Sequence, residues 1–313
     1  MKTLVTGASG FVGAHLLASL GPNTTVIGRK PVPFHDGPYF FADFDGFEAN
    51  EAAFVNIDVV VHCAARAHVM NDQESDPLSV FRKVNTYSTI KLAEMAAKNR
   101  VKRFIYISSI KVNGEDTSLT APFTAHDVPK PEDAYGISKL EAEQQLLEIA
   151  KNTGMEVVII RPPLVYGSGV KGNFRTLQNV VNKRIPLPFR SITKNKRSMV
   201  FVGNLVNLIE TCISHPNAGN KIFLVSDDHD ISTAEMIDKM SSACRKGNFS
   251  LPVPVFLLEI LGKVTGRSDM INRLTGSLQV DISETKKILD WQPLFNITEG
   301  FDQVENFHTR KVK

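Results

Sequence analysis

The chain has 313 residues, of which 42% are hydrophobic and 22% are charged, and its net charge is +3. This length can bury one large core or two smaller ones, and the composition is ordinary for a soluble globular protein. The small net charge argues against nucleic acid as a partner but suits an anionic small molecule. Three cysteines, Cys63, Cys212 and Cys244, have no metal-like spacing, so we expect no metal and a reducing, cytoplasmic compartment.

No stretch of the sequence predicts insertion into a membrane. The most apolar late stretch, residues 252–264, is interrupted by Glu259 and Lys263 and is too short to span a bilayer. Met1 leads straight into a strand pattern, so no signal peptide is expected.

A glycine-rich turn near the N-terminus predicts a dinucleotide site. Residues 2–6 have a strand pattern, residues 11–20 have an apolar helical pattern, and Gly-Ala-Ser-Gly-Phe-Val-Gly at residues 7–13 joins them. In this context the glycines allow a tight turn and a close approach of the backbone to a pyrophosphate, which the helix N-terminus binds. The alternative is a glycine turn that serves packing only.

The end of the second predicted strand, residues 24–27, bears on the choice of cofactor. Gly28, Arg29 and Lys30 follow it, where NAD sites usually place an acid that binds the ribose hydroxyls. Because a guanidinium pairs with a 2′-phosphate, Arg29 favours NADP, and NAD stays possible. The alternative is a solvated basic turn.

Strand and helix patterns alternate up to residue 161 and predict a doubly wound parallel sheet, the Rossmann type of α/β fold. Residues 57–62, Ile-Asp-Val-Val-Val-His, form a run rich in β-branched residues, as expected for a buried parallel strand. A short strand ending at Asp43 precedes it. The later strands are expected at residues 103–107 and 156–161, and the helices at residues 79–98 and 133–152.

Tyr135 and Lys139 are four residues apart, so they share one face of the helix predicted over residues 133–152. A free tyrosine has a pKa of about 10 and is a poor acid or base at neutral pH. A nearby ammonium group stabilises the phenolate, so we expect Lys139 to lower the tyrosine pKa and the pair to move a proton at a carbon–oxygen centre. The alternative is an ordinary amphipathic helix with an exposed lysine.

These motifs together resemble the extended short-chain dehydrogenase/reductase superfamily, in its nucleotide-sugar epimerase/dehydratase branch. The likeness extends to Cys-Ala-Ala at residues 63–65, Arg-Pro-Pro-Leu-Val-Tyr-Gly at residues 161–167 and Leu-Asp-Trp-Gln-Pro at residues 289–293. It implies a Rossmann domain over residues 1–166, to whose sheet residues 197–230 return with strands at 200–202 and 221–225. Residues 167–196 and 231–313 would form a smaller C-terminal substrate-binding lobe, largely helical over residues 250–279.

The resemblance assigns roles to individual residues. Ser109, Tyr135 and Lys139 would be the catalytic trio. Tyr135 would exchange a proton with the sugar, Ser109 would bind the same oxygen, and Lys139 would hold the nicotinamide ribose. Ser109 is preferred to Ser108 because residues 109–114 align with the epimerases' Ser-x-x-Val-Tyr-Gly. The implied cofactor contacts are Gly7, Gly10, Phe11, Val12, Gly13, Arg29, Asp43, Phe44, Ala64, Ala65, Asn85, Tyr135, Lys139 and Pro162, and the implied substrate contacts are Ser109, Asn173, Arg197 and Arg273.

Departures from the family pattern narrow the expected reaction. The 4,6-dehydratases place Asp-Glu where this chain has Ile110 and Lys111, and the GDP-fucose synthase type places a cysteine at the position of Lys111. Hydride transfer at one carbon therefore remains. Asn204 stands where the family often has Asp, a change with no assigned effect.

Residues 225–228 and 276–281 resemble a bacterial polysaccharide subgroup. The resemblance and Arg29 lead us to expect reduction of a UDP-4-keto-6-deoxy-N-acetylhexosamine with NADP. The alternatives are a UDP-hexose 4-epimerase with tightly bound NAD and, in another class, a non-catalytic NADP-binding regulator, against which the intact trio argues. A homodimer through the helices at 78–98 and 133–152 is also implied.

Overall fold

A computed structural model describes residues 1–33, 35–43, 47–67, 76–244, 247 and 249–310. A seven-stranded parallel sheet forms its centre, in the order β3-β2-β1-β4-β5-β6-β9. The doubly wound α/β fold is therefore confirmed. Its strands are β1 (Thr3–Thr6), β2 (Thr25–Gly28), β3 (Tyr39–Phe41), β4 (Val59–His62), β5 (Arg103–Ile107), β6 (Glu156–Arg161) and β9 (Lys221–Leu224).

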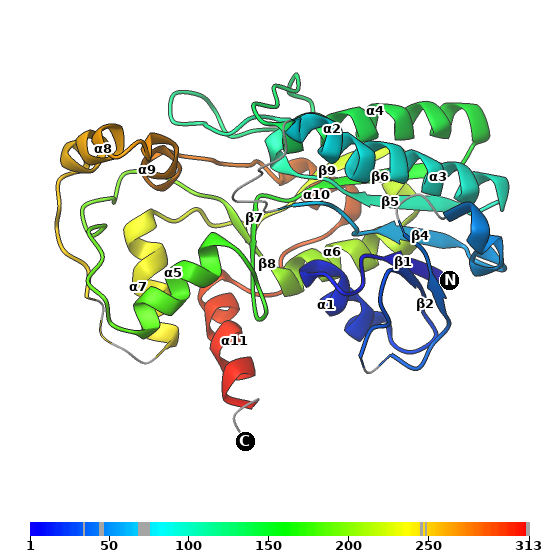
Figure 1. Ribbon diagram of the computed structural model, residues 1–313, viewed down its shortest axis with the longest axis horizontal. Coiled ribbons are helices and arrows are strands. Elements are labelled where there is room, and N and C mark those ends of the chain that lie inside the picture. Colours follow the sequence, from blue (N-terminus) through cyan, green and yellow to red (C-terminus); the bar gives the residue numbers. More distant parts are fainter. Residues whose placement is uncertain (34, 44–46, 68–75, 245–246, 248, 311–313) are drawn as a thin grey trace.

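Helices cover both faces of this sheet and also build a second lobe, which Figure 1 shows at the opposite end of the molecule from the N-terminal strands. Within the described residues, no helix is long and apolar enough to cross a membrane. The helices are α1 (Phe11–Leu20), α2 (Pro77–Phe81), α3 (Ser88–Lys98), α4 (Ala134–Thr153), α5 (Asn173–Asn182), α6 (Val202–Ser214), α7 (Thr233–Ala243), α8 (Val255–Val264), α9 (Ser268–Thr275), α10 (Ser283–Leu289) and α11 (Ile297–Arg310). Shorter helical turns are Phe47–Phe54, Ile110–Val112 and Pro216–Ala218.

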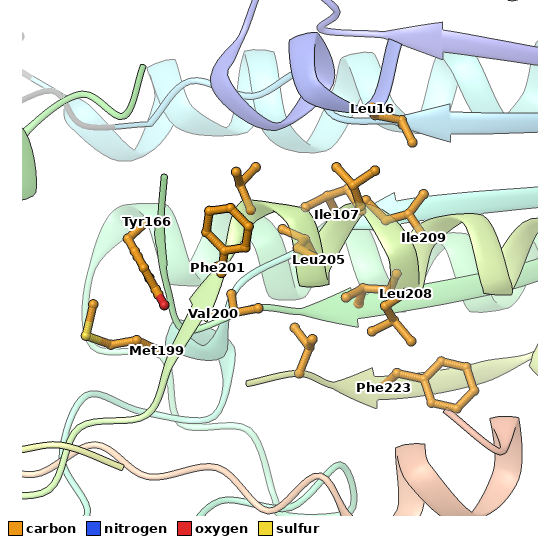
Figure 2. Packing of buried hydrophobic residues seen from close by; sticks show 14 of the residues in the cluster. Leu16, Ile107, Tyr166, Met199, Val200, Phe201, Leu205, Leu208, Ile209 and Phe223 are labelled. Carbon is orange, nitrogen blue, oxygen red and sulfur yellow. The ribbon is translucent and has the colours of Figure 1, made fainter. Parts of the chain in front are cut away.

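The alternation of strand side chains sorts the core into two layers. Phe104 and Tyr106 of β5 belong to the layer under α3 and α4, whereas Ile105 and Ile107 belong to the layer under α1 and α6. Figure 2 shows the second layer, where Leu205 and other apolar residues of α6 face the sheet. Both faces are buried, which is why the strand sequences are continuous apolar runs.

Two elements differ from the sequence expectation. Met199–Phe201 forms β8, which pairs with β7 (Leu164–Tyr166) in a separate two-stranded sheet. The expectation that residues 200–202 return to the main sheet is therefore wrong, and β9 alone joins it from that region. The helix predicted over residues 79–98 is divided, because a π-helical segment, Arg82–Tyr87, lies between α2 and α3. Such wide turns are often found at functional sites.

Asn204 has a structural explanation. Its buried amide donates to Asp227 Oδ1 (2.7 Å) and to the carbonyl of Phe295 (2.8 Å). Asp227 also accepts from the Tyr166 hydroxyl at 2.8 Å, and its pKa is raised, mainly by burial. An aspartate at position 204 would put a second carboxylate beside the first, so the amide suits this buried network.

Candidate functional site

The glycine turn lies where the strand order reverses, between β1 and β4, which is the usual place for ligands in such sheets. Gly7 has φ +72°, and a side chain there would come within 2.4 Å of the Ala64 nitrogen. A Cβ on Gly13 would lie 2.3 Å from the Gly7 carbonyl oxygen. These glycines therefore let α1 and the β4 loop approach the turn closely, as a pyrophosphate cradle requires.

The start of α1 suits an anion. Gly10 is its N-cap, and among the described residues no side chain caps the helix and no acid stands in its first turn. Gly10 is exposed and Phe11 and Val12 are half-buried, as are Ala64 and Ala65 after β4. Open helix amides next to small residues fit a dinucleotide phosphate.

The residues expected near the adenosine ribose lie at the ends of β2 and β3. Arg29 follows β2 directly and Asp43 comes two residues after β3, and both are exposed. Phe44 lies outside the described residues. The described part of the chain contains no group of three or more His, Cys, Asp or Glu side chains that could hold a metal ion.

The predicted trio comes together at the start of α4. The Ser109 hydroxyl lies close enough to the Tyr135 phenol to lower its pKa. Lys139 is 1% exposed, donates to the carbonyl of Ile107 at 2.8 Å, and places its ammonium 5.9 Å from the Tyr135 ring centroid. Ser108 points elsewhere, into the buried core beside Glu143 (2.5 Å). The geometry thus agrees with the choice of Ser109.

The acidities of the pair differ from the sequence expectation. Burial raises the pKa of Tyr135 to about 12, the Ser109 hydrogen bond opposes this rise, and the charge of Asp133 adds to it. Burial also lowers the pKa of Lys139 to about 7. The expected lowering of the tyrosine pKa is wrong for this structure, because desolvation raises that pKa and the Lys139 ammonium lies 4.5 Å from the Tyr106 ring centroid, closer than to the Tyr135 ring.

Lys111, in the short helical turn after Ser109, contacts the N-cap residue of α4, the helix that carries Tyr135. Sequence reasoning missed this role. The Lys111 ammonium donates to Asp133 Oδ2 (2.5 Å) and to Glu115 Oε1 (2.6 Å). Asp133 is the N-cap of α4 and accepts from the Gly136 amide at 2.7 Å. The available signal was Asp133 itself, a capping residue just before a helical pattern.

A buried ion pair between Glu143 and Arg161 lies next to Lys139 of the trio. Glu143 follows Lys139 by one helical turn and accepts from Arg161 Nη2 at 2.5 Å, and both side chains are 2% exposed. Arg161 also donates to Asn113 Oδ1 (3.0 Å). The Glu143 carboxylate raises the pKa of Lys139 against the larger lowering effect of burial. It therefore helps keep a buried ammonium charged.

Two predicted cofactor residues form hydrogen bonds that hold neighbouring segments in place. Asn85 is fully buried in the π-helical segment, accepts from the Arg66 amide (2.8 Å), and donates to the Arg66 carbonyl and to Ser138 Oγ (both 3.1 Å). Its amide thus fixes the β4 loop against α4. Pro162 is buried, and its carbonyl accepts from the Ile110 amide at 3.0 Å.

Of the predicted substrate residues, two are brought together. Arg197 donates to the carbonyl of Arg273 at 2.9 Å, and the Arg273 side chain lies 3.7 Å from Glu115. Glu115 in turn contacts Lys111, so both arginines adjoin the tyrosine end of the site. Burial lowers the pKa of Arg197. Asn173 is exposed and begins α5.

Comparisons with known proteins place the chain in a family. Residues 3–226 match the NAD dependent epimerase/dehydratase family. The chain is 52% identical over 305 residues to a UDP-glucose 4-epimerase of Vibrio cholerae, covering 96% of this chain and 93% of the relative. It is 26% identical over 330 residues to an N-acetyl-alpha-D-glucosaminyl-diphospho-ditrans,octacis-undecaprenol 4-epimerase of Escherichia coli O157:H7, covering 99% and 97%. Its fold matches that of UDP-glucose 4-epimerase from Thermotoga maritima with a TM-score of 0.78, 19% identity and full coverage of both chains.

Proposed function

Because the chain belongs to the NAD dependent epimerase/dehydratase family, we propose that this enzyme is a UDP-hexose 4-epimerase that keeps a nicotinamide dinucleotide bound through turnover. The observation that carries the proposal is the likeness to the Vibrio cholerae UDP-glucose 4-epimerase along nearly the whole chain. The reduction of a 4-keto sugar, which the sequence led us to expect, has no comparable support. It becomes the second candidate.

The trio supports proton transfer at C4. A bound nicotinamide dinucleotide supplies the acceptor, and later the donor, of the C4 hydride. The Tyr135 phenolate would take the C4 hydroxyl proton during the oxidation. It would return the proton after the 4-keto sugar has rotated to present its other face. The Ser109 hydroxyl, which lies beside Tyr135, would bind the same oxygen. Lys139, whose ammonium donates to the Ile107 carbonyl, would supply a buried donor to the ribose.

The lobe of residues 167–196 and 231–313 supplies the rest of the proposed site. Arg197 and Arg273, joined by a hydrogen bond from the Arg197 guanidinium to the Arg273 carbonyl, would pair with the UDP diphosphate. Lys111 occupies the position where an elimination reaction needs an acid, and its ammonium is engaged by Asp133 and Glu115. This supports interconversion at C4 over loss of water.

One observation favours the second candidate, a 4-keto reductase. Arg29 follows β2 where NAD sites usually carry an acid, and a reductase that exchanges NADPH would use a guanidinium there. The choice of NADP or NAD is therefore tied to the choice of reaction.

The experiment incubates purified enzyme with UDP-glucose or UDP-N-acetylglucosamine, without added cofactor, and follows the sugar protons by NMR. The 4-epimer should appear, and Tyr135→Phe should slow it by about a thousandfold while dinucleotide binding persists. If no epimer forms but NADPH is consumed with a UDP-4-keto-6-deoxy-N-acetylhexosamine, the reductase is correct. N-acetylglucosaminyl-diphospho-undecaprenol belongs in the panel because the Escherichia coli relative is named for it.

Assembly and location complete the proposal. We expect a homodimer through the outer faces of α3 and α4 and a reducing, cytoplasmic environment for the three free cysteines. Sedimentation velocity tests the first point, and a monomer at micromolar concentration would contradict it.

A further inference from the structure

Apolar side chains gather on one side of α8, at the far end of the second lobe in Figure 1. Eight of the seventeen exposed large hydrophobic side chains in the described residues lie between Phe249 and Met270, so they are concentrated and not scattered. We define the outer face of α8 by five of them. They are Phe256, Leu257, Ile260, Leu261 and Val264, which are 45–80% exposed.

Helical geometry puts these five residues on one side. With about 100° per residue, positions 256, 257, 260, 261 and 264 span roughly 140° of the helix circumference. Leu258 and Gly262 lie on the opposite side and are buried. Glu259 and Lys263 lie between the exposed and the buried side, along one edge of the apolar stripe, and give that edge a polar border.

The exposure of the outer face is not explained by a loosely held helix. Leu258 packs with Ile192 and Ile271 in a small core of its own. A Cβ on Gly262 would lie 2.8 Å from Ile271 Cγ1, so α8 and α9 touch closely. The helix is therefore anchored through its inner side, and its outer face is presented at a fixed orientation.

Cationic residues occur at both ends of α8. Residues 171–197 contain eight Lys and Arg residues and no acid. This segment adjoins the chain that leads into α8, because the Leu251 amide donates to the Leu187 carbonyl (2.7 Å) and the Arg190 backbone amide donates to the Leu251 carbonyl (3.3 Å). Lys263 and Arg267 are exposed at the other end of α8.

We propose that the outer face of α8 docks this lobe on an anionic phospholipid surface. An apolar helix face with cationic neighbours has the chemistry of an interfacial helix, whose side chains enter the acyl boundary while bases meet the headgroups. At ten residues α8 is about 15 Å long, which suits a helix lying in the membrane plane. Five half-exposed side chains offer roughly half of the ~800 Å² that each partner buries in a standard protein interface.

Docking of this kind has a consequence for the candidate site. Helix α9 packs on α8 and carries Arg273, which lies beside Arg197 and Glu115. The helix that carries Arg273 would then belong to the docked part of the lobe.

The test is flotation of the full-length enzyme with vesicles of phosphatidylethanolamine and phosphatidylglycerol, compared with pure phosphatidylcholine. The enzyme should float with the anionic vesicles and should be released as salt is raised. The triple variant Phe256→Gln, Ile260→Gln, Leu261→Gln should lower the bound fraction at least about tenfold. Lys263→Gln and Arg267→Gln should each lower it about fivefold.

The matched control is Leu119→Gln with Val128→Gln, which changes two exposed apolar residues that do not belong to α8 (98% and 76% exposed) and should leave flotation unchanged. Glutamine keeps helix propensity, and unchanged thermal melting checks folding. If the native enzyme does not float, or if the control loses binding equally, the proposal is wrong. If the triple variant instead turns a dimer into a monomer in sedimentation, the outer face is a subunit interface. No sugar is present, so the result is independent of the proposed reaction.

Discussion

Changing Asp133 to Asn and Lys111 to Met should move the pH dependence of turnover in opposite directions. Burial is the main cause of the raised pKa of Tyr135, and the Asp133 charge adds to it. Asparagine keeps the cap on Gly136 but removes the charge, so the tyrosine pKa should fall. Methionine leaves the Asp133 carboxylate without its 2.5 Å ammonium partner, so the tyrosine pKa should rise.

The size of each effect follows from the geometry. Lys111 makes two charge-assisted hydrogen bonds, each worth about 1.5–3 kcal/mol where it is shielded from water. Because Asp133 is 37% exposed, we expect Lys111→Met to lower the free energy of unfolding by about 2 kcal/mol in total. The Asp133 carboxylate, two residues before Tyr135 and in a medium between water and protein interior, should change the Tyr135 pKa by about half a unit.

The assay is kcat/KM for the UDP-sugar between pH 6 and 10. Oxidation of the hydroxyl needs the phenolate, so below the Tyr135 pKa of about 12 the rate should rise with pH across the whole range. In that range a fall of half a unit in the tyrosine pKa should raise the rate about threefold at each pH, and an equal rise should lower it about threefold. We therefore expect Asp133→Asn to be faster and Lys111→Met to be slower than the native enzyme at every pH, while Lys111→Arg keeps the native profile. Changes of rate in the same direction for Asp133→Asn and Lys111→Met would refute an electrostatic role for this pair.

Three further predictions concern other parts of the site. Gly13→Ala, whose methyl group would collide with the Gly7 carbonyl, should weaken dinucleotide binding at least about tenfold in a fluorescence titration, and unchanged affinity would contradict the cradle. Glu143→Ala should cost about 3–5 kcal/mol in urea unfolding, because it leaves the Arg161 guanidinium buried without its carboxylate; a loss below 1 kcal/mol would argue against that. Burial, with a smaller effect of the nearby lysine, lowers the pKa of His62 to about 3, so the unfolded state binds more protons between pH 6.5 and 3. Stability should therefore fall on acidification by up to about 1.4 kcal/mol per pH unit, and His62→Gln should lose that component of the slope.

Much of the fold could be predicted because burial on both faces leaves a plain signature. Apolar runs such as residues 59–61 are typical of strands in a parallel sheet that helices cover on both faces. The glycine turn before an apolar helix was equally specific, since Gly7 and Gly13 occupy positions where any Cβ collides with backbone.

One prediction was wrong because a short apolar segment has two possible strands to pair with. Residues 199–201 are as apolar as the sheet strands, and their composition cannot say whether they pair with β6 or with β7. The π-helical segment was hidden for a similar reason. The sequence of this segment is compatible with an ordinary α-helix. The wide turn goes with a contact to α4, in which the buried Asn85 side chain donates to Ser138 Oγ, and the sequence does not reveal that contact.

The acidity of Tyr135 shows why a motif does not determine its own chemistry. Tyrosine and lysine four residues apart predict a lowered phenol pKa, but this holds only if water still reaches the pair. Here the neighbouring core desolvates both groups, and Asp133 acts against the phenolate from the cap of the same helix. Lys111, which in the sequence marks only a missing dehydratase acid, moderates that carboxylate from across the site. The proton chemistry of this enzyme therefore depends on contacts 22 positions apart in the chain, which spacing alone cannot reveal.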